Sequence, residues 1–250
     1  SLLLILLPSL VYLSSCTKLK DPNLGTDCRI VKINVVDRGI FHYTYDNHLR
    51  MTSVAVEVSG QRQTMAEISY VPGKAFINFY QSTNGAATSE ADLDQFGNVT
   101  HASVKDPSGS GIGSVDFEYN EWNAPKPVRA IVEGFINGTS NLLHDTIYFT
   151  WADSDLIHLT SSSQEIAYDY YSDKPAPITR YGNGNIILLI GDMSDAASAL
   201  SQNYLKTYDI GGASQIEYSY DFDQEGKVRT IFWSTLTDQG TSTVSYQCDH

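Results

Sequence analysis

The sequence is short of several features that would point to a specific function. It contains three cysteines, and its 16 lysines and arginines are scattered and outnumbered by 29 acidic residues, which gives a net charge of −13. We expect such an acidic chain to have neither nucleic acid nor anionic lipid headgroups as its main partner. It also lacks a G-x-S-x-G motif, an H-E-x-x-H motif and a glycine-rich phosphate loop before a helix, so the sequence predicts no catalytic residue, metal site or cofactor.

Long apolar stretches are missing too, apart from the run Leu2–Leu13. This run is shorter than the ~20 residues that cross a bilayer, and it has the length of the apolar part of a secretory signal peptide. It ends in Leu13-Ser14-Ser15-Cys16, which resembles the lipobox of bacterial lipoproteins. The run would also fit a buried core segment, but Pro8 and the two serines favour the signal peptide. The resemblance implies removal of residues 1–15 and acylation of Cys16, whose acyl chains would be the link to the membrane.

The chain therefore divides into three predicted parts. Residues 1–15 are the signal peptide and residues 16–27 are a lipid-anchored tether, which is polar and contains Pro22 and Gly25. Residues 28–250 form one folded domain. The lipobox implies an outer-membrane lipoprotein, and the sequence leaves open whether it faces the periplasm or the cell surface.

The two cysteines outside the lipobox are Cys28 and Cys248, near the start and the end of the predicted domain. Disulfides persist in the oxidising compartments outside the cytoplasm, and the ends of a domain often lie close together. We therefore expect a Cys28–Cys248 disulfide, with two unpaired thiols as the alternative.

A degenerate motif recurs in the segments Phe41–Val54, Leu93–Ala102 and Ile216–Ile231. Its common form is an aromatic or apolar residue, then Asp-x-x-Gly, a basic residue or Asn, and an apolar strand. An aspartate at the start of a turn accepts backbone hydrogen bonds from two residues further on, and a glycine supplies a positive φ. The spacing predicts β-hairpins with Gly97 and Gly226 at positive φ. Leu49 holds the glycine position in the first copy, so that turn must differ or be strained.

These copies resemble the YD-repeat-like lipoproteins of Bacteroidota, whose short motif is Tyr-Asp-x-x-Gly-Arg-Leu. The resemblance covers most of residues 28–246, with three good copies. It implies a hairpin-repeat architecture and says little about function.

The predicted fold is mostly β, an antiparallel sheet of successive hairpins. A long twisted meander is the first choice and a two-sheet sandwich the second. One segment departs from the β pattern, because Met193, Ala196, Leu200 and Tyr204 follow one another at helical spacing. We expect one short helix near 192–204.

Aromatic side chains are the candidate ligand-binding residues. An aromatic row on a sheet can stack on sugar rings or bind a protein, although the same alternation fits strands whose aromatics form the core. We expect at least two of the candidates to be exposed on one sheet face: Tyr43, Tyr45, Trp122, Tyr170, Tyr218 and Trp233.

The sequence thus favours a non-catalytic cell-envelope protein with a binding or scaffold role, whose partner is a glycan or an envelope protein. The alternative is a carbohydrate-active hydrolase that uses cross-strand carboxylates. Such an enzyme would have two close carboxylates in a concave pocket, one of them with a raised pKa.

Overall fold

The computed structural model describes residues 28–36, 38–80, 87–120, 126–135, 142–176, 201, 203–212 and 214–248. These residues form an all-β structure of sixteen strands. None of them belongs to a helix that is long and apolar enough to cross a membrane.

The strands follow one another along the chain, and most of the connections between them are short. Their bounds are β1 Cys28–Val35, β2 Gly39–Tyr45, β3 Met51–Val58, β4 Gln61–Val71, β5 Lys74–Phe79, β6 Ala87–Leu93, β7 Val99–Lys105, β8 Gly111–Tyr119, β9 Pro127–Phe135, β10 Leu142–Ala152, β11 Asp155–Thr160, β12 Glu165–Pro175, β13 Asn203–Ile210, β14 Ser214–Phe222, β15 Val228–Ser234 and β16 Gln239–Cys248.

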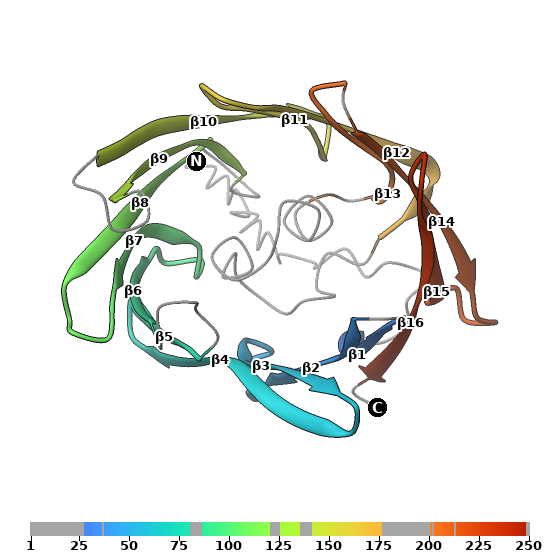
Figure 1. Ribbon diagram of the computed structural model, residues 1–250, viewed down its shortest axis with the longest axis horizontal. Coiled ribbons are helices and arrows are strands. Elements are labelled where there is room, and N and C mark those ends of the chain that lie inside the picture. The colour runs from blue at the N-terminus through green and yellow to red at the C-terminus, as the bar shows by residue number, and fades with distance from the viewer. Residues whose placement is uncertain are drawn as a thin grey trace, which may run out of the picture.

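The sheet is a closed antiparallel barrel (Figure 1). Each strand pairs with its neighbours in sequence, as the hairpin motif predicts, and β1 pairs with β16. The closing register runs from Cys28 opposite Cys248 to Val35 opposite Ser242. An open meander and a two-sheet sandwich are therefore both wrong. The sheet has no free edge in the described ladders, because its first and last strands satisfy one another.

The helix predicted near 192–204 is wrong at its C-terminal end. Asn203 and Tyr204 belong to β13, and Tyr204 is a buried residue of the barrel. The remaining positions of that prediction, 192–200 and 202, lie outside the described residues.

Four hairpin turns share one hydrogen-bond pattern, and each begins with an aspartate. In the β6–β7 turn the Asp94 carboxylate accepts the N–H groups of Phe96 at 2.8 Å and Asn98 at 2.9 Å. Turns that begin at Asp46, Asp106 and Asp223 repeat this pattern.

The glycine position of these turns lies at positive φ. Gly97 has φ 86° and Gly226 has φ 81°, which confirms the sequence prediction. Leu49 keeps the same turn with φ 63° and is strained there, since a side chain at positive φ crowds the backbone.

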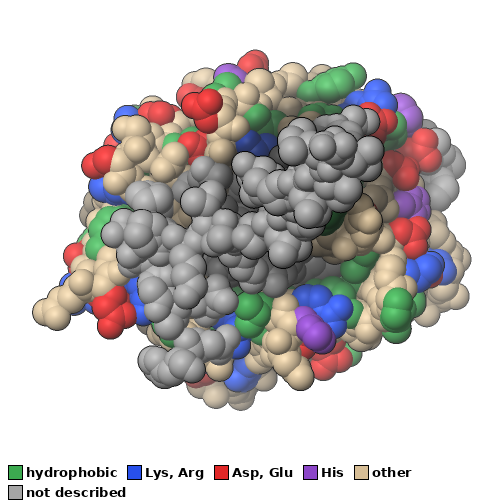
Figure 2. Space-filling view, turned by 180° about the vertical axis from the view of Figure 1, so that it is seen from behind, with side chains coloured by type: hydrophobic (Ala, Val, Ile, Leu, Met, Phe, Trp, Pro, Cys, Tyr) green, Lys and Arg blue, Asp and Glu red, His purple; other side chains and the backbone are tan. Residues whose placement is uncertain are grey.

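The two faces of the barrel wall differ in character. The inner face carries three apolar clusters, with Met51 and Ile77 in the first, Ile30 in the second and Leu156 in the third. Because side chains alternate along a strand, the charged residues between these apolar positions, such as Lys74 and Glu90, lie on the outer face. Figure 2 shows acidic, basic and histidine side chains distributed around the perimeter of the molecule.

Candidate functional site

The outer wall of the barrel carries a series of ion pairs that join neighbouring strands. Between β5 and β6, for example, Lys74 of one strand pairs with Glu90 and Asp92 of the next. Among the described residues these outer-wall pairs are His42–Glu57, Lys74–Glu90, Lys74–Asp92, His101–Asp116, Arg129–Glu118, His144–Glu133, His158–Glu165, Lys206–Asp169 and Arg229–Asp221. Exposed pairs of this kind add at most about 1 kcal/mol each to stability, so their main consequence is a highly polar outer surface.

Four of these pairs join a histidine to a carboxylate on the adjacent strand. His101 lies 2.7 Å from Asp116, and His42 lies 3.0 Å from Glu57. A metal site would need at least a third ligand close by. Within the described residues, no three His, Cys, Asp or Glu side chains gather in this way.

The inner wall holds the aromatic residues that the sequence proposed as an exposed binding face. Tyr43 packs against two of the apolar clusters, and Tyr170 and Tyr218 pack against a third. Tyr45 and Trp233 are also only partly exposed. The predicted exposure is therefore wrong for these five residues, and Trp122 lies outside the described part of the chain. Their alternation placed them on the core side of the strands.

Inner-wall aromatics are further tied to the backbone of the preceding strand. Tyr45, near the end of β2, donates its hydroxyl hydrogen to the carbonyl of Ile30 at 2.7 Å, and Tyr170 donates to the carbonyl of Leu156 at 2.7 Å. The pattern recurs at Tyr70, Tyr119, Trp151 and Tyr220. Each acceptor lies within the first three residues of its strand, so a row of partly buried hydrogen bonds runs around one end of the barrel.

Burial raises the pKa of the Tyr45 hydroxyl, although the Arg29 guanidinium lowers it in part. Burial likewise raises the pKa of Tyr70, which keeps both hydroxyl groups neutral and able to donate. Cations also lie over these rings, with the Arg50 guanidinium carbon 4.2 Å from the centre of Tyr70. The polar atoms of Tyr45 and Tyr170 are thus engaged inside the protein rather than presented to a ligand.

Among the described residues, three carboxyl groups have a shifted pKa: Asp46 and Asp106 in hairpin turns, and Asp145 in β10. Partial burial raises the pKa of Asp46, but hydrogen bonds from Arg50 and His48 and the Arg50 charge outweigh it, so the net pKa is lowered. The Ser108 hydroxyl lowers the pKa of Asp106, and the Ser162 N–H group lowers the pKa of Asp145. A general acid needs the opposite shift.

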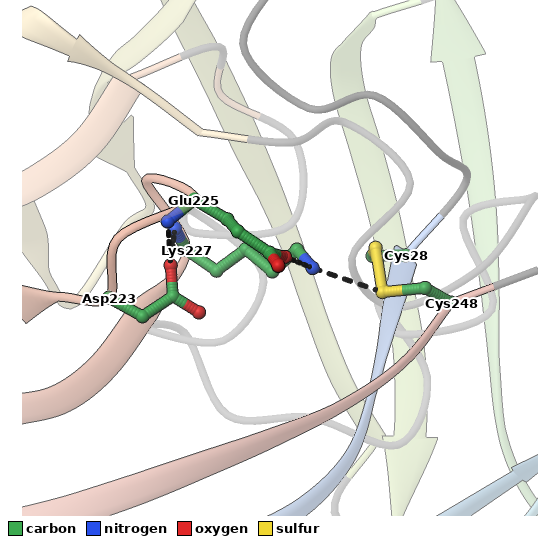
Figure 3. The surroundings of a disulfide bond; sticks show 5 residues. All are labelled: Cys28, Asp223, Glu225, Lys227 and Cys248. Carbon is green, nitrogen blue, oxygen red and sulfur yellow. Dashed lines mark hydrogen bonds and ion pairs between the residues drawn. A yellow bond between two sulfur atoms is a disulfide. The ribbon is translucent and has the colours of Figure 1, made fainter.

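The seam between β1 and β16 is the most distinctive chemical site. Cys28 begins β1, Cys248 ends β16, and the two form a disulfide with their Cα atoms 4.1 Å apart. The separation lies inside the ~7 Å limit for a disulfide. Lys227, which follows the Asp223 turn, places its Nζ atom 3.3 Å from the sulfur of Cys248 (Figure 3). The Glu225 carboxylate lies 2.5 Å from the same ammonium group.

Sequence reasoning singled out both cysteines but missed Lys227. The signal was present, because Lys227 holds the basic position of the turn motif in Ile216–Ile231. Its contact with Cys248 became evident only from the register of β15 with β16, which carries the end of the last strand back to the β14–β15 turn.

Comparison with known proteins shows the fold and no more. No family model and no curated protein matches the sequence. Among solved structures, a porin-like protein from Bacteroides uniformis is 14% identical with a TM-score of 0.59, over 88% of this chain and 96% of that one. A porin-like protein from Bacteroides vulgatus is 10% identical with a TM-score of 0.54, over 88% and 99% of the two chains. The resemblance to YD-repeat lipoproteins gains no support from these matches, and the chain shares a β-barrel fold with the porin-like proteins.

Proposed function

We propose that this chain is a non-catalytic, lipid-anchored protein of the cell envelope, with a binding or scaffold role and a barrel that stands in water beside the membrane. The observation that carries this proposal is the polarity of the two faces of the barrel wall. The acyl chains on Cys16, rather than the strands, would hold the protein at the membrane.

The outer wall supports the proposal because it has the opposite character to a lipid-facing wall. Transmembrane barrels present an apolar band to lipid, and a lysine or arginine at the middle of that band costs about 2–4 kcal/mol. Here Lys74, Arg129, Lys206 and Arg229 all lie on the outer wall with acidic partners. Insertion would place all of these charges in or near hydrocarbon.

The inner wall of the barrel also supports the proposal that the barrel stands in water. The lumen of a transmembrane pore is lined by polar side chains that contact water. Apolar clusters lie along the inner wall of this barrel, and Met51, Ile77, Val99 and Leu156 are each 0% exposed. Side chains that line an open channel would contact water, and these four do not.

A channel is the second candidate function, since the solved structures with this fold are porin-like proteins. Both faces of the wall argue against it. The hydrolase alternative has less support, because the shifted carboxyl groups Asp46, Asp106 and Asp145 all have lowered pKa values.

The test is to replace residues 1–16 with a cleavable signal sequence that lacks a lipobox and to fractionate the cells. We expect the anchor-free protein to be recovered folded from the periplasm or medium without detergent, while the unaltered chain stays with the membranes. Planar-bilayer recordings of both forms should give no conductance steps. An anchor-free protein that resists alkaline extraction from membranes and conducts ions would establish the channel instead.

The binding role is assigned to the outer surface and hairpin tips in place of the inner-wall aromatics. Phe96 at the β6–β7 turn is 71% exposed and Leu236 at the β15–β16 turn is 94% exposed. A glycan array and a pull-down from envelope extract, each with wild type and with Phe96→Ala and Leu236→Ala, test this assignment. Loss of binding in either variant supports it. Binding that both variants retain would assign the contact to another surface.

A further inference from the structure

We propose that the Cys28–Cys248 disulfide is a thiol–disulfide exchange site in which Lys227 makes Cys248 the reacting sulfur and Cys28 the resolving one. The reactants it fits are a dithiol or disulfide of another envelope protein, or a small thiol such as glutathione. This site adds a redox-sensitive link to the seam of the barrel.

The two cysteine residues differ in their exposure to solvent. Cys28 is 4% exposed at the start of β1, whereas Cys248 is partly exposed at the end of β16. Thiol–disulfide exchange needs a direct approach of the attacking sulfur to the sulfur attacked. An external reactant therefore reaches Cys248 first.

Charge favours the same sulfur. The ammonium group of Lys227 lies 3.3 Å from the Cys248 sulfur, and its side chain is 13% exposed, which shields the contact from water. In the reduced protein a nearby lysine stabilises the Cys248 thiolate, which is then the nucleophile. In the oxidised protein the same charge attracts an incoming thiolate toward this sulfur. In Figure 3 the Lys227 side chain runs from the Asp223 turn toward the sulfur of Cys248.

Two acidic residues set the position of this ammonium group. The Asp223 carboxylate accepts the backbone N–H of Lys227 at 2.9 Å, which fixes the turn. The Glu225 carboxylate pairs with Nζ at 2.5 Å and offsets part of its charge. The field at Cys248 is therefore positive but weaker than that of an unpaired lysine.

The oxidative reaction balances in two steps. The Cys248 thiolate attacks a disulfide of the partner, forms a mixed disulfide and releases one partner thiolate. The Cys28 thiol then loses its proton, attacks the Cys248 sulfur and releases the second partner thiolate, so two electrons pass to the partner. In the reverse direction an external thiolate attacks Cys248, and Cys28 leaves as a thiolate that takes up a proton.

The test uses the full chain, purified with its disulfide intact and challenged with reduced glutathione. Quenched samples are alkylated, and mass spectrometry gives both the rate of disulfide opening and the cysteine that carries glutathione. We expect glutathione on Cys248. We expect K227M to slow opening about fivefold, which is the lower end of the effect of a unit charge about 4 Å away.

K206M is the matched control, because Lys206 pairs with Asp169 on the outer wall and has no contact with the disulfide. It should open at the wild-type rate, and K227R should retain most of that rate. Equal rates for K227M and wild type would overturn the role of Lys227. Should K227M fail to fold, the wild-type protein alone still decides the outcome, because glutathione on Cys28 would refute the assignment.

Discussion

Gly240 lies beneath the indole ring of Trp233, the residue opposite it across the β15–β16 ladder. A Cβ atom built on Gly240 would lie 2.4 Å from Cζ2, 2.6 Å from Cε2 and 2.7 Å from Nε1 of Trp233. The body of a rigid ring occupies the space, so Gly240→Ala forces the indole to move. The glycine thus lets the aromatic ring lie flat on the inner wall.

The effect of Gly240→Ala on the free energy of unfolding follows from these distances. Carbon atoms in contact prefer a separation of about 3.5–4.0 Å, so the ring must retreat by roughly 1 Å. Overpacking of this kind costs about 1–3 kcal/mol. Replacing glycine by alanine also restricts the unfolded chain, which returns about 0.4–1 kcal/mol. Gly240→Ala should therefore lower the free energy of unfolding by about 1–2 kcal/mol.

The assay is urea unfolding followed by far-UV circular dichroism, which is independent of the tryptophan signal. The control is Gly111→Ala, because a Cβ at Gly111 has no neighbour within 4 Å and should be neutral or slightly stabilising. A double-mutant cycle with Trp233→Leu isolates the contact, and Gly240→Ala should cost nothing in that background. The same loss of stability in both backgrounds would refute the reasoning.

Three further predictions concern the turns and the anchor. Asp46 has a lowered pKa in the folded state, so its stabilising effect is present above about pH 4 and is lost as pH falls through that lower pKa. The roughly 1 kcal/mol advantage of wild type over Asp46→Asn at pH 6 should therefore shrink progressively as pH falls below about 4 in pH-dependent denaturation, and a constant difference would contradict it. Leu49→Gly should raise the free energy of unfolding by about 0.5–1 kcal/mol, whereas Gly97→Val should lower it by about 1–2 kcal/mol, both by urea titration. Cys16→Ala should leave an unprocessed precursor that takes up no labelled fatty acid, and continued labelling would exclude the lipobox.

The hairpins could be predicted from the sequence because their signals are local. An aspartate begins each of the four turns and a glycine follows three residues later in three of them, and the structure places Gly97 and Gly226 at positive φ as the motif requires. Closure of the barrel, in contrast, has no local sequence signal. It depends on the pairing of β1 with β16, which are joined by a disulfide across a sequence separation of 220 residues. Cys28 and Cys248 were the one sign of it in the sequence.

The sequence also encodes which face of the sheet the aromatic residues occupy, but the pattern of a single strand is not enough to identify that face. In β2, Tyr43 and Tyr45 alternate with His42 and Thr44, which shows two different faces without showing which one is buried. The same alternation recurs in β8 and β14, where Asp and Glu alternate with Phe and Tyr. A charged face repeated around the whole sheet must face water, so the aromatic face must be the core.

Because the first and last strands pair with each other, the barrel does not require the chain to begin at β1. Cys28 and Cys248 are paired in the ladder with their Cα atoms 4.1 Å apart, so a short peptide linker could take the place of the disulfide. New ends could then be opened in the exposed Asp106–Ser110 turn, with every strand pair retained and β7 and β8 as the new seam. A chain that begins at β8 starts at the opposite rim from one that begins at β1, because the strands alternate in direction. The proposed lipid anchor of this circular permutant would therefore leave the barrel at the other end.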